Sequence, residues 1–148
     1  MDASAESGDA MTALTISRFA ILGFYAGLVG LLFLLLSARV VRLRSQLKVD
    51  IGDGDRPELV QAIRAQANCA EYAPLVLLLM VPLAAAGSHP VVLHGLGAAL
   101  LIGRVLHAQG LSGNPGYSVG RFWGISISWA TLLVASLLCI LLWFGIRI

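Results

Sequence analysis

The sequence predicts an all-α membrane protein built as a bundle of four transmembrane helices. Hydrophobic residues make up 58% of the 148 residues and charged residues only 12%, and the apolar residues gather into four long runs. Soluble domains contain about 25% charged residues, so a soluble fold of this size could not hide so much apolar surface. Backbone groups find no water in lipid, and continuous runs such as LVGLLFLLL favour helices over a closed barrel.

The four spans follow from the length that a bilayer requires. A hydrocarbon core of about 30 Å needs about 20 helical residues. The predicted spans are residues 14–38, 57–86, 91–111 and 117–144, separated at GSHP (87–90) and at the turn cluster SGNPG (112–116). A polar N-terminal tail, residues 1–13, precedes the transmembrane domain, residues 14–148. The tail carries acidic residues where a signal peptide would be basic, so we interpret the first run as an uncleaved helix.

The distribution of basic residues predicts the orientation. The first connection is expected to hold Arg39, Arg42, Arg44, Lys48 and Arg56. Arg104 and Arg121 flank the third connection, whereas the second connection has no Lys or Arg and the N-terminal tail is acidic. Positive loops stay on the cytoplasmic side, so we expect the first and third connections there and both termini on the opposite side.

Several classes of function are disfavoured by composition. A net charge of +2, without basic residues interleaved with aromatics, does not indicate a nucleic-acid partner. The three histidines and two cysteines lack zinc-ligand spacing, so no metal cofactor is expected. The two cysteines lie in different apolar runs, which argues against a disulfide framework. The acidic segment 49–58 lacks the pattern of an EF-hand and is interpreted as a solvated turn.

A polar stripe in the second span is the strongest functional signal. Arg64, Asn68, Glu71 and Tyr72 have offsets of 0, +4, +7 and +8, which places them on one helical face, and Gln61 extends it. Ionisable groups inside a span are costly and normally face a bundle interior or a watery cavity. An ion pair of Arg64 with Glu71 that only locks helices is the structural alternative; the accompanying amide and phenol favour a binding function.

Polar residues of the third and fourth spans lie at the same depth. Arg104, His107 and Leu111 share a face of the third span, and Arg121 begins the fourth. Either arginine could instead be an anchor at the membrane interface. His94, alone in its span, is expected to be packed or hydrogen-bonded.

The chemistry of these residues suggests a small zwitterionic ligand rich in carboxylates. Arginine binds carboxylates bidentately, Glu71 would accept an ammonium group, and an arginine beside a thiol would favour the thiolate.

The stretch RAQANCAEYAP, residues 64–74, strongly resembles the second-helix motif of the MAPEG family, the membrane-associated proteins of eicosanoid and glutathione metabolism. The amino-acid sequence of this stretch, including Gln66 and Cys69, most resembles that of the branch of leukotriene synthases and microsomal glutathione transferases. The resemblance covers roughly residues 14–146. It implies a four-helix bundle that assembles as a homotrimer, with glutathione bound between neighbouring subunits.

The resemblance also implies individual roles. The residues expected to bind glutathione are Arg64, Asn68, Glu71 and Tyr72 of the motif, Arg104 and His107 of the third span, and Arg39 from the adjacent subunit. Arg121 is expected to stabilise the thiolate. The family often has tyrosine where His107 and Leu111 stand, and leucine cannot replace its hydroxyl.

We therefore expect a membrane glutathione transferase, with peroxidase activity as a further option, that joins the glutathione thiolate to lipophilic electrophiles from the bilayer. The alternative is a non-catalytic MAPEG-like protein that binds a lipid or a partner. A small transporter would need discontinuous helices or repeats, and the sequence has neither.

Overall fold

Four long helices make up the structure, a computed structural model that describes residues 3–113 and 118–146. They are α1 (Ala3–Leu47), α2 (Pro57–Ala85), α3 (Pro90–Gly113) and α4 (Val119–Trp143). All four are long and apolar enough to cross a membrane. This confirms the predicted fold class, a four-helix membrane bundle.

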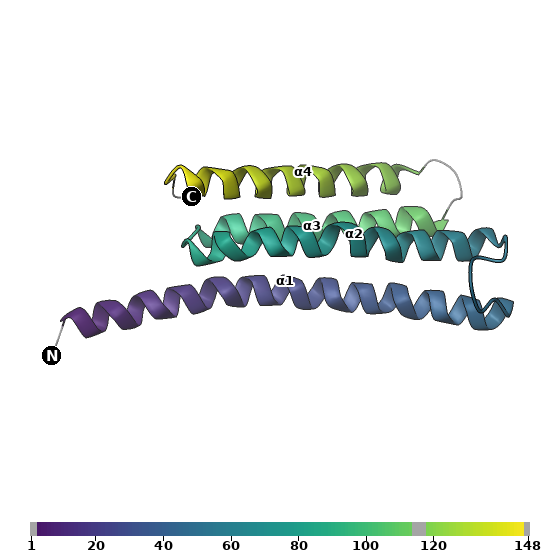
Figure 1. Cartoon of the computed structure of the whole chain (residues 1–148), viewed down its shortest axis with the longest axis horizontal. Helices are drawn as coiled ribbons and strands as arrows, with labels where there is room; N and C mark the ends of the chain where they lie inside the picture. The colour runs from purple at the N-terminus through teal and green to yellow at the C-terminus, as the bar shows by residue number, and fades with distance from the viewer. Residues whose placement is uncertain (1–2, 114–117, 147–148) are drawn as a thin grey trace.

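The helices α2 and α3 form the centre, with α1 and α4 on opposite sides of them (Figure 1). α1 packs on α2 and α3, and α4 packs on α3 and α2, but among the described residues α1 and α4 do not touch. The fully buried side chains come mainly from the central pair and include Leu59, Val76, Met80, Leu83, Leu93 and Leu100. The core of one chain therefore lies along the middle helices.

The first helix is longer than the sequence predicted. Its 45 residues span about 68 Å, more than twice the hydrocarbon core of a bilayer. Arg39, Arg42 and Arg44, which we expected in the first connection, lie in α1, so that expectation was wrong. A helix need not end where the lipid ends, and the predicted tail is helical from Ala3 onward.

A left-handed residue ends α1. Lys48 has φ of 56°, and the Val49 amide donates to the Arg44 carbonyl at 3.1 Å, which closes the last turn. The connection that follows contains Gly52 and Gly54, both also at positive φ. It is shorter than predicted, since the helix takes up nine of its expected residues, 39–47.

The remaining boundaries lie within two residues of the predicted ones. α2 begins at Pro57, where a missing amide proton costs nothing, and Pro74 and Pro82 are accommodated in its interior. α3 begins at Pro90, the last residue of the predicted break and one residue before the predicted start. Of the predicted turn 112–116, the first two residues close α3, and the others, with Tyr117, lie outside the described residues.

Glycines bring α3 and α4 into backbone contact. A Cβ at Gly124 would overlap the backbone nitrogen of His107, and a Cβ at Gly110 would overlap that of Arg121. Small residues allow membrane helices to approach this closely. The contact fixes α4 against the polar end of α3, where His107 and Arg121 lie.

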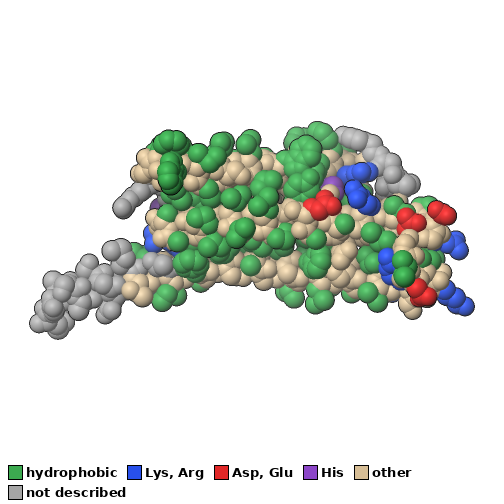
Figure 2. All heavy atoms as spheres, viewed as in Figure 1, with side chains coloured by type: hydrophobic (Ala, Val, Ile, Leu, Met, Phe, Trp, Pro, Cys, Tyr) green, Lys and Arg blue, Asp and Glu red, His purple; other side chains and the backbone are tan. Residues whose placement is uncertain are grey.

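The molecular surface fits a lipid environment. Apolar side chains cover the flanks of the helices, whereas most charged side chains of the visible face gather at the end that carries the α1–α2 connection (Figure 2). Leu31, Leu34 and Leu35 of α1 are each more than 60% exposed. In the other half of the bundle, the Tyr25 hydroxyl lies 3.2 Å from Nδ1 of His94, which confirms a hydrogen-bonded histidine.

Candidate functional site

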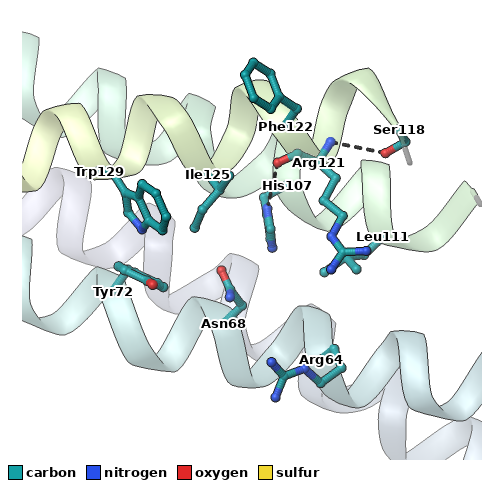
Figure 3. A pocket seen from close by; sticks show the side chains of 10 residues that line it. All are labelled: Arg64, Asn68, Tyr72, His107, Leu111, Ser118, Arg121, Phe122, Ile125 and Trp129. Atoms are coloured by element: carbon teal, nitrogen blue, oxygen red, sulfur yellow. Dashed lines mark hydrogen bonds between the residues drawn. The ribbon is translucent and has the colours of Figure 1, made fainter. Parts of the chain in front are cut away.

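A pocket of ≈ 350 Å³ lies between α2 and the α3–α4 pair, in the half of the bundle nearest the α3–α4 connection (Figure 3). This volume is within the range of about 300–1,000 Å³ that is usual for small-molecule sites. Its lining consists of Arg64, Asn68, Tyr72, His107, Leu111, Ser118, Arg121, Phe122, Ile125 and Trp129. The sequence predicted five of these ten residues as site residues: Arg64, Asn68, Tyr72, His107 and Arg121.

One wall comes from the polar stripe of α2. Arg64, Asn68 and Tyr72 follow one another at intervals of four residues, so their side chains lie one turn apart along the same face. Asn68 and Tyr72 are half-buried and Arg64 is exposed. The helix thereby presents a cation, an amide and a phenol to one cavity.

The opposite wall comes from α3 and α4. His107 is buried, and its Nδ1 lies 3.1 Å from the carbonyl oxygen of Arg121. Because a carbonyl can only accept, Nδ1 carries the proton and donates, which leaves Nε2 of the neutral ring as an acceptor. The ring extends from α3 toward Asn68 of α2 (Figure 3).

The start of α4 positions Arg121. Ser118 caps the helix: its hydroxyl accepts from the Arg121 amide at 3.2 Å and donates to the Gly110 carbonyl at 2.8 Å. The cap therefore ties the first turn of α4 to the end of α3. The exposed side chain of Arg121 extends from this turn toward α2 (Figure 3).

Arg104 lies behind the pocket instead of in its lining. Its side chain is 2% exposed and reaches Asn68 of α2 and Ser128 of α4. The guanidinium carbon is 5.3 Å from the centre of the Tyr72 ring. This burial excludes the alternative that Arg104 is an interface anchor, because an anchor would extend to the headgroups.

Two predicted residues lie away from the pocket. Glu71 is exposed on α2 and does not line it. Arg39 lies on α1, where it lines a separate hollow with Arg42. Since Arg64 and Glu71 are both exposed, they do not form an ion pair buried between helices of one chain.

Sequence reasoning missed the apolar and aromatic side of the pocket. Ile125 and Trp129 follow Arg121 at intervals of four residues, so the same helical spacing that revealed the α2 stripe could have revealed them. Ser118 and Phe122 are also in the lining, while Ser128 contacts Arg104 behind it. A serine in an apolar helix gives no such signal by itself.

Comparison with known proteins assigns the family. The family model described as MAPEG family matches residues 22–141, a range that contains the whole pocket lining. The chain belongs to the MAPEG family. The match confirms the resemblance indicated by the second-helix motif.

MAPEG relatives place the chain among membrane proteins. This chain is 38% identical over 110 residues to the inner membrane protein YecN of Escherichia coli K12. The alignment covers 74% of this chain and 82% of YecN. The YecN protein of Escherichia coli O6:H1 is similar to the same extent. The four apolar helices and these relatives identify an integral, multi-pass membrane protein.

Proposed function

We propose that this MAPEG protein is a glutathione transferase of the leukotriene-synthase and microsomal-transferase kind. The observation that carries the proposal is the pocket: the motif residues Arg64, Asn68 and Tyr72 face His107 and Arg121 across a cavity of ≈ 350 Å³. The guanidinium of Arg64 suits a carboxylate of glutathione, that of Arg121 suits its thiolate, and the amide and imidazole suit its peptide groups. The apolar residues Ile125 and Trp129 on the same cavity would accommodate a lipophilic co-substrate.

The proposed reaction is attack by the glutathione thiolate on an electrophilic carbon. With 1-chloro-2,4-dinitrobenzene, a C–S bond forms, the C–Cl bond breaks, chloride leaves and the thiol proton passes to water. A free cysteine thiol titrates at about 8.5, so only a few per cent is thiolate at neutral pH. Arg121 is proposed to stabilise the thiolate, while the α2 residues hold the tripeptide.

A homotrimer is part of this proposal. Glu71 is exposed on a span, and a carboxylate facing lipid is costly. A neighbouring copy packed on α2 would cover Glu71 and bring its own Arg39 toward the pocket. Glutathione would then lie between subunits, with Glu71 and the neighbour's Arg39 completing its binding site.

Leu111 favours a second candidate, a MAPEG-like protein that binds a lipid or partner without catalysis. It lines the pocket where the family often has tyrosine, so a hydroxyl donor is replaced by an apolar side chain. Such a protein would show binding without turnover.

The test is to measure glutathione binding and conjugation on purified protein in detergent. Millimolar glutathione should raise the apparent Tm, and conjugation of 1-chloro-2,4-dinitrobenzene should depend on both glutathione and protein. Reduction of cumene hydroperoxide tests the peroxidase option. Stabilisation without turnover on either substrate would favour the non-catalytic candidate; no stabilisation and no turnover would refute glutathione as the ligand.

A further inference from the structure

A buried arginine connects three helices behind the pocket. The group formed by Arg104 with Asn68, Gly124 and Ser128 is named here the Arg104 clasp. Arg104 Nε donates to Ser128 Oγ at 2.9 Å, and one terminal nitrogen donates to Oδ1 and the backbone oxygen of Asn68 at 2.7 and 3.1 Å. The other terminal nitrogen donates to the Gly124 carbonyl at 3.3 Å and to Ser128 Oγ.

These contacts use the whole donor capacity of the guanidinium. An arginine has five N–H groups, and the clasp supplies five hydrogen bonds, all to neutral oxygen atoms. Arg104 therefore has no donor left for a ligand while the clasp is intact. A buried cation without a carboxylate partner among these acceptors is expensive inside a span, which suggests that it serves the adjacent site.

The clasp determines which end of the Asn68 amide faces the pocket. Oδ1 accepts from Arg104 at 2.7 Å, so this end of the amide points into the clasp. Asn68 also lines the pocket, which leaves its NH₂ group as the part that can donate to a ligand. Without the cation, either end of an amide could face the cavity.

Ser128 keeps the guanidinium in place from the far side. It is 0% exposed, donates to the Gly124 carbonyl at 2.8 Å and accepts from two nitrogens of Arg104. Its oxygen would lie only 2.7 Å from a Cβ at Gly103, so that glycine leaves room for the hydroxyl. Ser128 thus contacts Arg104 on one side while Asn68 contacts it on the other.

We infer that Arg104 and Ser128 are positioning residues that fix the Asn68 amide with its NH₂ group toward the pocket, where it donates to an acceptor oxygen of the ligand. The identity of this acceptor, a carboxylate or peptide oxygen of glutathione, rests on the proposed function. The orientation of the amide does not depend on it.

Selective labelling tests the orientation without any ligand. Asn68 and Asn114 are the two asparagines of the sequence, so ¹⁵N-asparagine labelling gives two side-chain NH₂ signals. The variant Asn68→Asp identifies the Asn68 signal by its loss. Ser128→Ala should displace that signal, because the guanidinium loses the hydroxyl that accepts two of its five hydrogen bonds. An unmoved Asn68 signal would overturn the inference.

A matched serine provides the control. Ser136 of α4 donates to the carbonyl four residues earlier at 2.8 Å, as Ser128 does, but it is not in the clasp. Ser136→Ala should leave the Asn68 signal in place; an equal shift in both variants would contradict a specific role. If Ser128→Ala does not fold, Arg104→Lys keeps the charge but replaces the five donors of the guanidinium fork with three on one nitrogen, and should displace the signal likewise.

Binding measurements then separate positioning from support of the fold. Asn68→Asp keeps acceptors for Arg104 but lacks the NH₂ donor, so it should fold normally and bind glutathione about tenfold more weakly, the scale of one hydrogen bond to a charged group. Unchanged affinity in this variant would contradict donation by Asn68. If the wild-type chain binds no glutathione, the proposed function fails, and the amide signals still decide whether Ser128 and Arg104 position the Asn68 amide.

Discussion

At the scale of single residues, Arg121 is expected to act on the sulfur of glutathione. Arg121→Ala should lower turnover, and the loss should be larger at pH 6.5 than at pH 9. Without the guanidinium, the pKa of the bound thiol rises by about one unit or more, so less thiolate is present below that pKa. Conjugation rates across this pH range, at saturating glutathione, are the measurement.

Two other arginines serve as comparisons for Arg121→Ala. Arg64→Ala should mainly raise the glutathione dissociation constant, because Arg64 is proposed to hold a carboxylate and not the sulfur. Arg42→Ala, an exposed arginine on α1 outside the pocket, should change neither turnover nor affinity. If Arg121→Ala keeps the wild-type pH profile, another residue stabilises the glutathione thiolate.

Much of the pocket could be predicted from residue types at fixed spacing. Arg64, Asn68 and Tyr72 are polar in an apolar span, so their shared face was visible in the sequence and lines the cavity. The position of Arg104 was not visible, because burial behind the pocket depends on Ser128, whose small hydroxyl is common in membrane helices. The spacing of residues in the sequence predicts which side chains share a face of one helix. It does not predict which side chains of another helix that face contacts.

At the scale of helices, the contact between α3 and α4 depends on the absence of a side chain at Gly124. Gly124→Ala should destabilise the protein by about 1–3 kcal/mol, the usual cost of overpacking a close contact, because the new Cβ would overlap the backbone of His107. The measurement is the apparent Tm in detergent together with glutathione affinity, which should fall as His107 and Arg121 move apart.

A second helical glycine is the matched control for Gly124. A Cβ at Gly95 of α3 would have no atom within 4 Å. Gly95→Ala should therefore be neutral or stabilise the helix by up to about 1 kcal/mol. Equal losses of Tm at both positions would contradict a specific role for the α3–α4 contact, because helix propensity alone favours alanine at both positions.

Helix boundaries were predictable where a glycine or proline interrupts the apolar pattern of the sequence, and less so elsewhere. Pro57 and Pro90 mark the starts of α2 and α3 within one residue of the predicted starts. The end of α1 was missed because basic residues are interspersed among residues 39–47, although the helix continues through them. It ends at Lys48, which is not a usual left-handed residue.

At the scale of the whole molecule, we predict a threefold homotrimer. The particle in a nanodisc should contain three copies of the 15.6 kDa chain, about 47 kDa of protein. An exposed carboxylate such as Glu71 is costly within a span unless a partner surface covers it. Arg39 lies on α1 away from the pocket of its own chain, so it could contribute only to the pocket of another copy. A particle mass that corresponds to one or two chains would refute this arrangement.

The orientation of the molecule yields a separate prediction. In a chain with Cys69 and Cys139 replaced by alanine, Asp53→Cys should react with a membrane-impermeant maleimide only from the cytoplasmic side. The reason is that the basic residues at the end of α1 and in the connection that follows favour that side. His89→Cys, at an exposed position of the second connection, should react only from the opposite side. Labelling in the reverse sense would invert the predicted topology.

The lack of contact between α1 and α4 in the described residues has a consequence for biosynthesis. Each helix packs only on helices one or two places away in the chain. A helix that leaves the ribosome therefore meets partners among those inserted just before it, and α1 does not have to wait for α4. α1, α2 and α3 can associate while α4 is still being translated, so the pocket, which needs α4, is the last feature to form.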